Sequence, residues 1–181
     1  MAADEATSPK ANTEIGEQGP ITETILKLCE RIPGEDVELI QNIAAYLHSL
    51  KSIQTKEPIF TRTADQVIQS GEQWGCQEAG LVFVTLLRAK EEKASFIQAF
   101  LREDLVDYKI GKPNYVRGHV FLRQQTSNGY RVINSTTGEI TSELPEKYVF
   151  GAEGLDSWDI GLRDGLKDYL LMFEKTKSYL Y

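Results

Sequence analysis

Apolar residues recur at helical spacing over the first third of the chain. After Pro20 they form one stripe, made of Ile21, Ile25, Leu28, Cys29 and Ile32. Beyond the turn at Pro33 and Gly34 they form a second stripe, made of Val37, Ile40, Ala44 and Leu47. A helix with one apolar stripe buries that face against a core, so both segments are predicted to be amphipathic helices.

Further helices are predicted before residue 90. Residues 63–66 (Thr-Ala-Asp-Gln) have the form of a capping box, in which two side chains satisfy free backbone N–H groups, and Gly71 is a typical helix stop. Residues 76–89 (CQEAGLVFVTLLRA) are apolar on nearly every side. Such a helix is buried all round, which predicts that it lies at the centre of the molecule.

The second half of the chain contains patterns typical of strands. Residues 94–101 (ASFIQAFL) indicate an inner strand, and GHVFLRQ and GYRVINS indicate a strand pair with turn residues 126–129 between them. Residues 102–117 are charged, hold Pro113 and are predicted to be a loop. A last helix is expected from the spacing of Leu162, Leu166, Tyr169, Leu170 and Phe173. Helices followed by an antiparallel sheet predict an α+β fold.

The first 19 residues are small, polar and without period. Such a segment has too little apolar surface to offset the entropy of ordering, so residues 1–19 are predicted to be a disordered tail. The length of 181 residues suits one domain with a tail better than two domains. Residues 20–181 are therefore expected to form a single domain.

Composition narrows the class of protein. The chain is 41% hydrophobic and 26% charged, with a net charge of -7 and no basic stripe, which argues against a nucleic-acid partner. No run approaches the roughly 20 apolar residues of a membrane span, and the N-terminus lacks the basic start and apolar core of a signal peptide. We expect a cytoplasmic protein without a membrane partner, whose Cys29 and Cys76 stay reduced.

Cys76 is the first candidate for chemistry. It falls in the first turn of the predicted central helix, directly after Gly75. The free N–H groups and partial positive charge of a helix N-terminus favour the thiolate, which is the nucleophilic form of cysteine. The backbone N–H of Cys76 can in addition stabilise an oxyanion. The alternative is a buried structural cysteine, which is how we interpret Cys29 on the apolar stripe of its helix.

His119 is the second candidate, at the start of a predicted strand. Residues 119, 121 and 123 share one face of that strand, and residues 130, 132 and 134 share one face of the next. Asn134 lies opposite His119 if the loop spans residues 125–128, whereas a tight turn at residues 128 and 129 pairs Asn134 with Arg123 and removes the contact. In the first register the carboxamide can orient the imidazole, as in a Cys-His-Asn triad. The alternative is a histidine that only packs on the sheet.

Together these segments resemble the transglutaminase-like core, a papain-like fold in which Cys, His and an acid or amide cooperate. The resemblance covers about residues 62–161 and is carried by RTADQVIQSGEQWGCQEAGLVFVTLLRA, ASFIQAF, GHVFL, YRVINSTTG and GLDSWDIG. It implies that Cys76 is the nucleophile and His119 the general base. Asn134 stands where small prokaryotic members usually carry Asp, and Ser135 replaces the usual proline.

The resemblance implies acyl transfer through a Cys76 thioester, on a protein or peptide substrate that offers an amide or a glutamine side chain. Water as acceptor gives a peptidase or amidase, and an amine gives a transglutaminase. A hydrolase of small amides on the same fold is a further alternative, and a non-catalytic interaction module is the main one. No cofactor is expected, and two Cys and two His without paired ligand spacing predict no metal site.

Overall fold

The computed structural model describes residues 15–54, 59–109 and 116–178. The helices in these ranges are α1 (Glu23–Arg31), α2 (Asp36–Ser49), α3 (Ala64–Ser70), α4 (Gly75–Ala89), α5 (Arg102–Lys109) and α6 (Leu166–Lys177). The strands are β1 (Lys51–Ser52), β2 (Glu72–Gln73), β3 (Ala94–Leu101), β4 (Gly118–Thr126), β5 (Gly129–Asn134), β6 (Ile140–Thr141) and β7 (Tyr148–Gly154). None of the helices in the described ranges is both long and apolar enough to cross a membrane.

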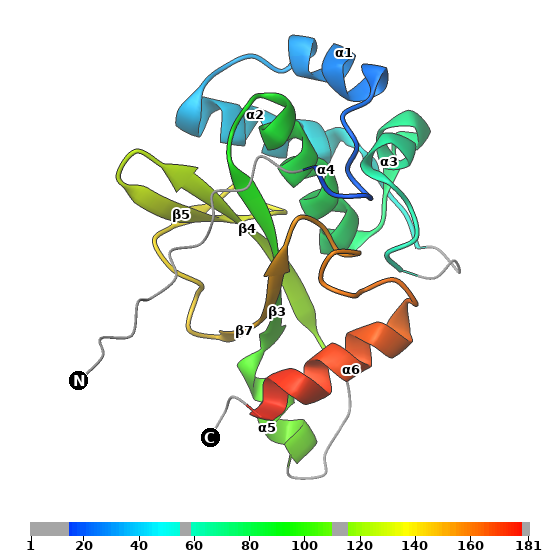
Figure 1. Ribbon diagram of the computed structural model, residues 1–181, viewed down its shortest axis with the longest axis vertical. Helices are drawn as coiled ribbons and strands as arrows, with labels where there is room; N and C mark the ends of the chain where they lie inside the picture. The colour runs from blue at the N-terminus through cyan, green and yellow to red at the C-terminus, as the bar shows by residue number, and fades with distance from the viewer. Residues whose placement is uncertain (1–14, 55–58, 110–115, 179–181) are drawn as a thin grey trace, which may run out of the picture.

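A five-stranded antiparallel sheet with the order β6-β5-β4-β3-β7 forms the centre of the fold. Helices α1 to α4 gather at one end of the molecule, and α5 and α6 lie at the other (Figure 1). Helix α4 packs directly on the sheet, because a Cβ added at Gly80 would lie only 2.3 Å from Cγ1 of Val120 on β4. This close approach brings the start of α4 to the sheet.

Local signals in the sequence account for the helix ends. The capping box is present, since Thr63 Oγ1 accepts from Gln66 N at 3.3 Å and Gln66 Oε1 accepts from Thr63 N at 2.8 Å. Helix α3 ends at Gly71, whose φ of +66° is the left-handed conformation expected of a terminal glycine. Helix α1 begins later than the pattern suggests, because Thr22 rather than Pro20 caps it. The predicted helix α3 is confirmed.

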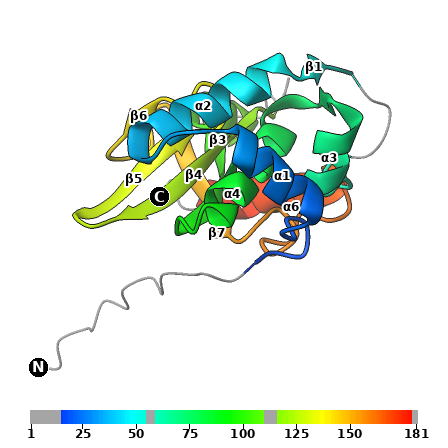
Figure 2. The ribbon, with the colours of Figure 1, turned by 90° about the horizontal axis from the view of Figure 1, so that it is seen from above.

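The main core lies between α4, the N-terminal helices and one face of the sheet. Every residue of α4 from Ala79 to Leu87 is buried, which confirms the prediction of a central buried helix. Helices α1 and α3 lie side by side next to α4 (Figure 2), and their apolar stripes close the core, including Cys29 at 6% exposure. A second cluster lies under α6, and a third lies on the opposite sheet face.

The predicted tail is wrong for residues 15–19, whereas residues 1–14 lie outside the described residues. Gln18 is 2% exposed, and its backbone N–H donates to Asp156 at 2.8 Å. Its side-chain amide donates to the backbone carbonyls of Phe60 at 3.2 Å and Arg62 at 2.8 Å. A polar side chain that satisfies buried carbonyls orders this segment, and hydropathy does not register such bonds. The GLDSWDIG segment, which holds Asp156, therefore binds the backbone of Gln18 and fixes residues 15–19 against the domain.

The predicted loop at residues 102–117 is also wrong, since Arg102–Lys109 form α5. Leu105 is fully buried in the cluster under α6, and Asp104 accepts from the backbone N–H of Arg117 at 2.6 Å. Tertiary contacts rather than an apolar stripe stabilise this short helix, so its sequence shows little helical periodicity. Strand β7, which pairs with β3 at the sheet edge, is not predicted either, because its glycines weaken the strand pattern.

The register of the β4–β5 hairpin is neither of the two predicted alternatives. Asn134 pairs with Phe121, which leaves a two-residue turn at residues 127 and 128. Asn134 therefore lies directly opposite neither His119 nor Arg123. All three registers differ by an even number of residues, so the predicted faces are correct and His119 and Asn134 still share one face.

Candidate active site

Cys76 lies in the first turn of α4, where the chain enters the helix through a bend that needs glycine. Gly75 has a φ of +66°, a left-handed conformation that costs a residue with a Cβ about 1 kcal/mol or more. Trp74, the N-cap residue of α4, makes no side-chain hydrogen bond to the first turn of the helix. The thiol of Cys76 is thus presented at a helix N-terminus, as predicted.

Glu78 holds this entry turn in place. Its carboxylate accepts a hydrogen bond from the backbone N–H of Trp74 at 2.6 Å and another from Nε of Arg62 at 2.7 Å. Arg62 also donates to the carbonyl of Glu72 at 3.2 Å, so the pair spans the segment that leads to Cys76. The two side chains are only 20% and 12% exposed, which makes their interaction stronger than that of a surface ion pair.

Burial controls the protonation of Cys76. Desolvation raises the pKa of its thiol from the ordinary 9.0 to about 11, and hydrogen bonds from the backbone of Val120 and of Cys76 itself counter only part of this rise. Desolvation also raises the pKa of Cys29. Whatever the helix N-terminus contributes in favour of the thiolate is smaller than the cost of burying the charge, so the net shift of the thiol pKa is upward.

His119 and Asn134 are in direct contact. Nε2 of His119 lies 2.8 Å from Oδ1 of Asn134, and the same oxygen accepts from the backbone N–H of Thr136 at 3.1 Å and from its hydroxyl at 2.9 Å. A backbone N–H can only donate, so the atom that it meets is the carbonyl oxygen of the amide, and His119 must donate from Nε2. Nδ1 of the neutral ring is then left as the proton acceptor.

Ser135 links the start of α4 to the strand that carries His119. It is fully buried, and its hydroxyl lies 2.7 Å from the carbonyl oxygen of Val120 and 3.4 Å from that of Cys76. Cys76 therefore lies close to Val120, which follows His119 on β4, and to Ser135, which follows Asn134 at the end of β5. The structure brings the three candidate residues into one region.

An aromatic cluster surrounds the imidazole. The ring of Tyr148 stacks on His119 with centroids 5.7 Å apart, and Phe121 meets the same ring edge-on at 4.9 Å. Burial lowers the pKa of His119, the hydrogen bond to Asn134 opposes that shift, and the charge of Lys147 adds to it. At neutral pH the imidazole is therefore uncharged. Sequence reasoning missed Tyr148 and Lys147, because they belong to the unpredicted strand β7 and the residue before it.

A cavity of about 140 Å³ lies on the other side of Cys76, lined by Leu47, His48, Ser52, Gln73, Gly75, Cys76, Ala79 and Thr136. Nε2 of His48 lies 2.5 Å from the carbonyl oxygen of Thr136, so this exposed histidine contacts the turn that follows Asn134. The side chain of Gln73 donates to the carbonyl of Leu47 at 2.9 Å. That bond uses one of the two N–H donors of the amide.

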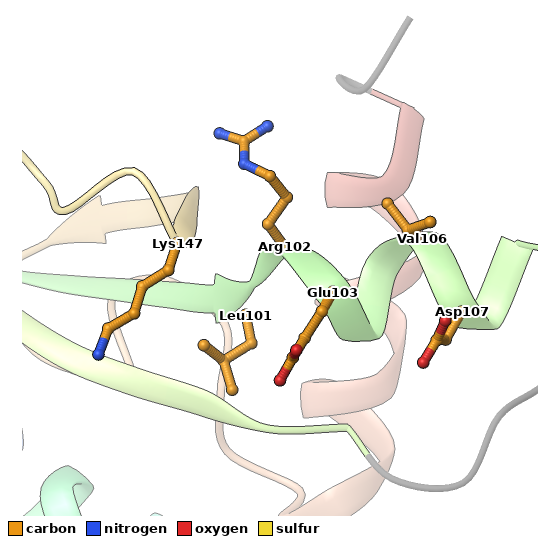
Figure 3. A pocket seen from close by; sticks show the side chains of 6 residues that line it. All are labelled: Leu101, Arg102, Glu103, Val106, Asp107 and Lys147. Carbon is orange, nitrogen blue, oxygen red and sulfur yellow. The ribbon is translucent and has the colours of Figure 1, made fainter.

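A larger hollow of about 460 Å³ lies where β3 runs into α5, lined by Leu101, Arg102, Glu103, Val106, Asp107 and Lys147. Figure 3 shows the side chains of Arg102 and Val106 pointing away from those of Leu101, Glu103 and Asp107. The amine of Lys147 lies 5.4 Å from the centre of the Tyr148 ring, which stacks on His119. Lys147 is therefore the residue that connects this hollow to the Tyr148 ring, and the hollow is lined by both apolar and charged side chains.

Within the described ranges, no group of three or more His, Cys, Asp and Glu side chains has an arrangement that could hold a metal ion. The side chains around Cys76 and His119 are the amide of Asn134, the hydroxyls of Ser135 and Thr136, the rings of Phe121 and Tyr148, and His48 in the cavity that Cys76 lines.

No protein-family model and no curated protein matches the chain in sequence. Among solved structures, it is similar to a proposed cysteine protease from Cytophaga hutchinsonii, with a TM-score of 0.61 at 12% identity. That match covers 82% of this chain and 47% of the other, so the chain spans about half the length of that protein. A second match is Legionella pneumophila LapG, with a TM-score of 0.48, 11% identity and coverage of 85% and 96%.

The likeness to the Cytophaga protein concerns the fold, in which a central helix packs on an antiparallel sheet. It confirms the predicted class, an α+β fold of the papain-like type, in which Cys76 lies on the buried helix and His119 and Asn134 lie on the sheet. The transglutaminase-like subclass and the catalytic roles of these residues remain predictions.

Proposed function

We propose that this protein is a cysteine-dependent enzyme that cleaves amide or peptide bonds in protein or peptide substrates through a thioester on Cys76. His119 acts as the general base and Asn134 orients it. The observation that carries the proposal is the hydrogen bond between His119 and Asn134 beside the first turn of α4. This hydrogen bond leaves Nδ1 of the imidazole able to accept a proton, and the Cys76 thiol lies at the nearby start of α4.

The reaction begins from the neutral pair. As the Cys76 sulfur attacks the carbonyl carbon of the substrate, the thiol proton passes to Nδ1 of His119. The imidazolium returns this proton to the leaving amine as the C–N bond breaks, and the acyl group remains on sulfur as a thioester. Water then attacks the thioester with His119 as base, which releases the acid and restores the thiol.

The pKa values favour this order of events. The thiol of Cys76, with a pKa of about 11, is protonated at neutral pH, and the lowered pKa of His119 keeps the imidazole neutral. Both groups are therefore ready for a transfer that occurs during attack rather than before substrate binding. In this proposal the backbone N–H of Cys76, in the first turn of α4, stabilises the oxyanion.

The acyl acceptor and the substrate are the finer parts of the proposal. Water as acceptor makes the protein a peptidase or amidase, and a primary amine makes it a transglutaminase, as the resemblance of the sequence suggests. The likeness of fold to a proposed cysteine protease favours water. The open hollow of about 460 Å³ that Lys147 helps to line offers room for a peptide chain, which supports a peptide over a small amide.

The second candidate function is a non-catalytic interaction module on the same fold. The thiol of Cys76 carries a pKa of about 11, which means that the free protein holds almost no thiolate at neutral pH. An inactive descendant of an enzyme would have the same property. Activity assays separate the two functions.

The test is to incubate the purified protein with casein and a fluorescent primary amine, and to measure released peptides and incorporated fluorescence in parallel. Whichever of these two signals the wild-type protein produces, we expect Cys76→Ala to reduce it to the background rate. The control Cys29→Ala removes the other thiol and should retain activity. If the wild-type protein and Cys76→Ala give equal rates in both channels, the enzymatic proposal is refuted and the interaction module is favoured.

A further inference from the structure

Tyr148 is the side chain that covers the face of the His119 imidazole. The two rings stack with their planes 29° apart and their centroids 5.7 Å apart. Phe121 meets Tyr148 edge-on, with centroids 5.0 Å apart, and meets His119 in the same way at 4.9 Å. The three rings therefore form one mutually contacting cluster, and the imidazole packs against two aromatic rings in addition to its hydrogen bond to Asn134.

The backbone and Lys147 fix the ring of Tyr148 in turn. Its N–H donates to the carbonyl of Pro145 at 2.8 Å, and the residue pairs with Leu101 in the sheet. The amine of Lys147 lies 5.4 Å from the centre of the same ring, within the range of a cation–π interaction. Tyr148 is thus not a loosely packed surface residue.

We propose that Tyr148 is a positioning residue of the active site, whose ring, and not its hydroxyl, holds the His119 imidazole and shields it from water. This inference rests on the proposed function, because it assigns the ring to the base of that reaction. An offset or tilted pair of aromatic rings gains energy beyond the area that it buries, and it fixes ring orientation. Without the stack, the imidazole keeps its bond to Asn134 but can rotate about it and meet water.

The charged and titratable groups around this pair come from several elements. Cys76 contributes from α4, Lys147 from the residue before β7, and Arg117 from the residue before β4, where it affects Tyr148. Burial is the largest cause of the lowered pKa of His119, and the charge of Lys147 is a smaller one. Removal of the Tyr148 ring exposes the imidazole to water, so the pKa of His119 should rise toward its ordinary value near 6.5.

The experiment combines an NMR titration of ¹⁵N-labelled histidine with enzyme kinetics. The four variants are Tyr148→Leu, Tyr148→Phe, Tyr130→Leu and Lys147→Met, and His48→Gln serves for signal assignment. Since the chain contains two histidines, the His48→Gln protein shows His119 alone and identifies its signals. We expect Tyr148→Leu to raise the pKa of His119 and to lower kcat about two- to tenfold at an almost constant KM. Tyr148→Phe, which keeps the ring, should match the wild type in both measurements.

Tyr130→Leu is the matched control. Tyr130 also carries a cation over its ring, Arg123 at 4.8 Å, but it is 50% exposed and pairs with Gln125 near the turn of the β4–β5 hairpin, away from His119 at the start of β4. Lys147→Met removes the charge and keeps the Tyr148 ring, so it should raise the pKa of His119, because the charge of Lys147 lowers it. It also provides a test if Tyr148→Leu fails to fold.

Two results would overturn the inference. One is a Tyr148→Leu protein with the His119 pKa and the kcat of the wild type. The other is a Tyr148→Phe protein with the same loss as Tyr148→Leu, which would assign the role to the hydroxyl. If the protein proves to have no activity, the NMR titration alone decides the inference, so its failure is distinct from that of the proposed function.

Discussion

His119 and Asn134 are hydrogen-bonded at 2.8 Å although they are not opposite each other in the sheet. Asn134 pairs with Phe121, so the two side chains meet along the diagonal between neighbouring pairs. Same-face residues on this diagonal lie about 7–8 Å apart, a gap that an imidazole and a carboxamide span together. The contact therefore requires that both residues share a face, and it does not require direct pairing.

Substitution of Asn134 should change the pH dependence of activity. The base must be neutral to accept a proton, so activity falls as the pH drops through the pKa of His119, which lies below its ordinary value. In Asn134→Asp the added negative charge stabilises the imidazolium and raises that pKa by about one unit. We expect the acid limb of kcat/KM to move to higher pH by this amount, and Asn134→Ala to lower activity at every pH.

The control for this series is Asn128→Asp, which adds the same charge in the exposed turn of the same hairpin. Its acid limb should coincide with that of the wild type. An Asn134→Asp profile that also coincides with the wild type would mean that Asn134 does not act on His119.

Alkylation by iodoacetamide should reveal the protonation state of Cys76. With a pKa of about 11, its thiolate fraction grows about tenfold per pH unit in the neutral and mildly alkaline range. We therefore expect the rate at Cys76 to rise continuously over this range, and to exceed that at Cys29, which is only 6% exposed. Mass spectrometry of the modified peptides measures both rates. A plateau below neutral pH would instead indicate a preformed thiolate–imidazolium pair.

Gly75 and Gly71 offer a matched pair for the backbone at the start of α4. Both have a φ of +66°, so Gly75→Ala and Gly71→Ala should each lower the free energy of unfolding by about 1 kcal/mol. A Cβ at Gly75 would also lie 3.1 Å from Oε1 of Gln77, beside the nucleophile, whereas a Cβ at Gly71 meets nothing within 4 Å. We expect only Gly75→Ala to lose activity. Equal activity in the two variants would contradict a role for this bend in presenting Cys76.

Gln18 should contribute to stability despite its position near the N-terminus. Its side chain donates to the carbonyls of Phe60 and Arg62 and accepts from Ser157, so Gln18→Ala removes three hydrogen bonds at a buried position. We expect the free energy of unfolding to fall by about 2 kcal/mol or more, as measured by urea denaturation. The control Gln41→Ala, at an exposed position of α2, should change it by less than about 0.5 kcal/mol. A neutral Gln18→Ala would show that this segment docks without contributing to stability.

Periodicity, caps and glycine stops determined the helical half of the fold. The box at Thr63 and Gln66, the stop at Gly71 and the apolar run of α4 are local patterns, since each depends on residues within a few positions of one another. The alternation of β4 and β5 likewise placed His119 and Asn134 on one face. These features could be predicted because short-range geometry decides them.

The sequence by itself thus determined that a cysteine begins a buried helix and that a histidine and an asparagine share one side of a strand pair. Only the tertiary structure decided the hairpin register, the helix at Arg102–Lys109, the burial of Gln18 and the stacking of Tyr148 on His119. It also decided the protonation state, because burial of Cys76 outweighs the helix N-terminus. The physical reason is common to all of these: each depends on desolvation or contact between residues far apart in the chain, which leaves no periodic trace in the sequence.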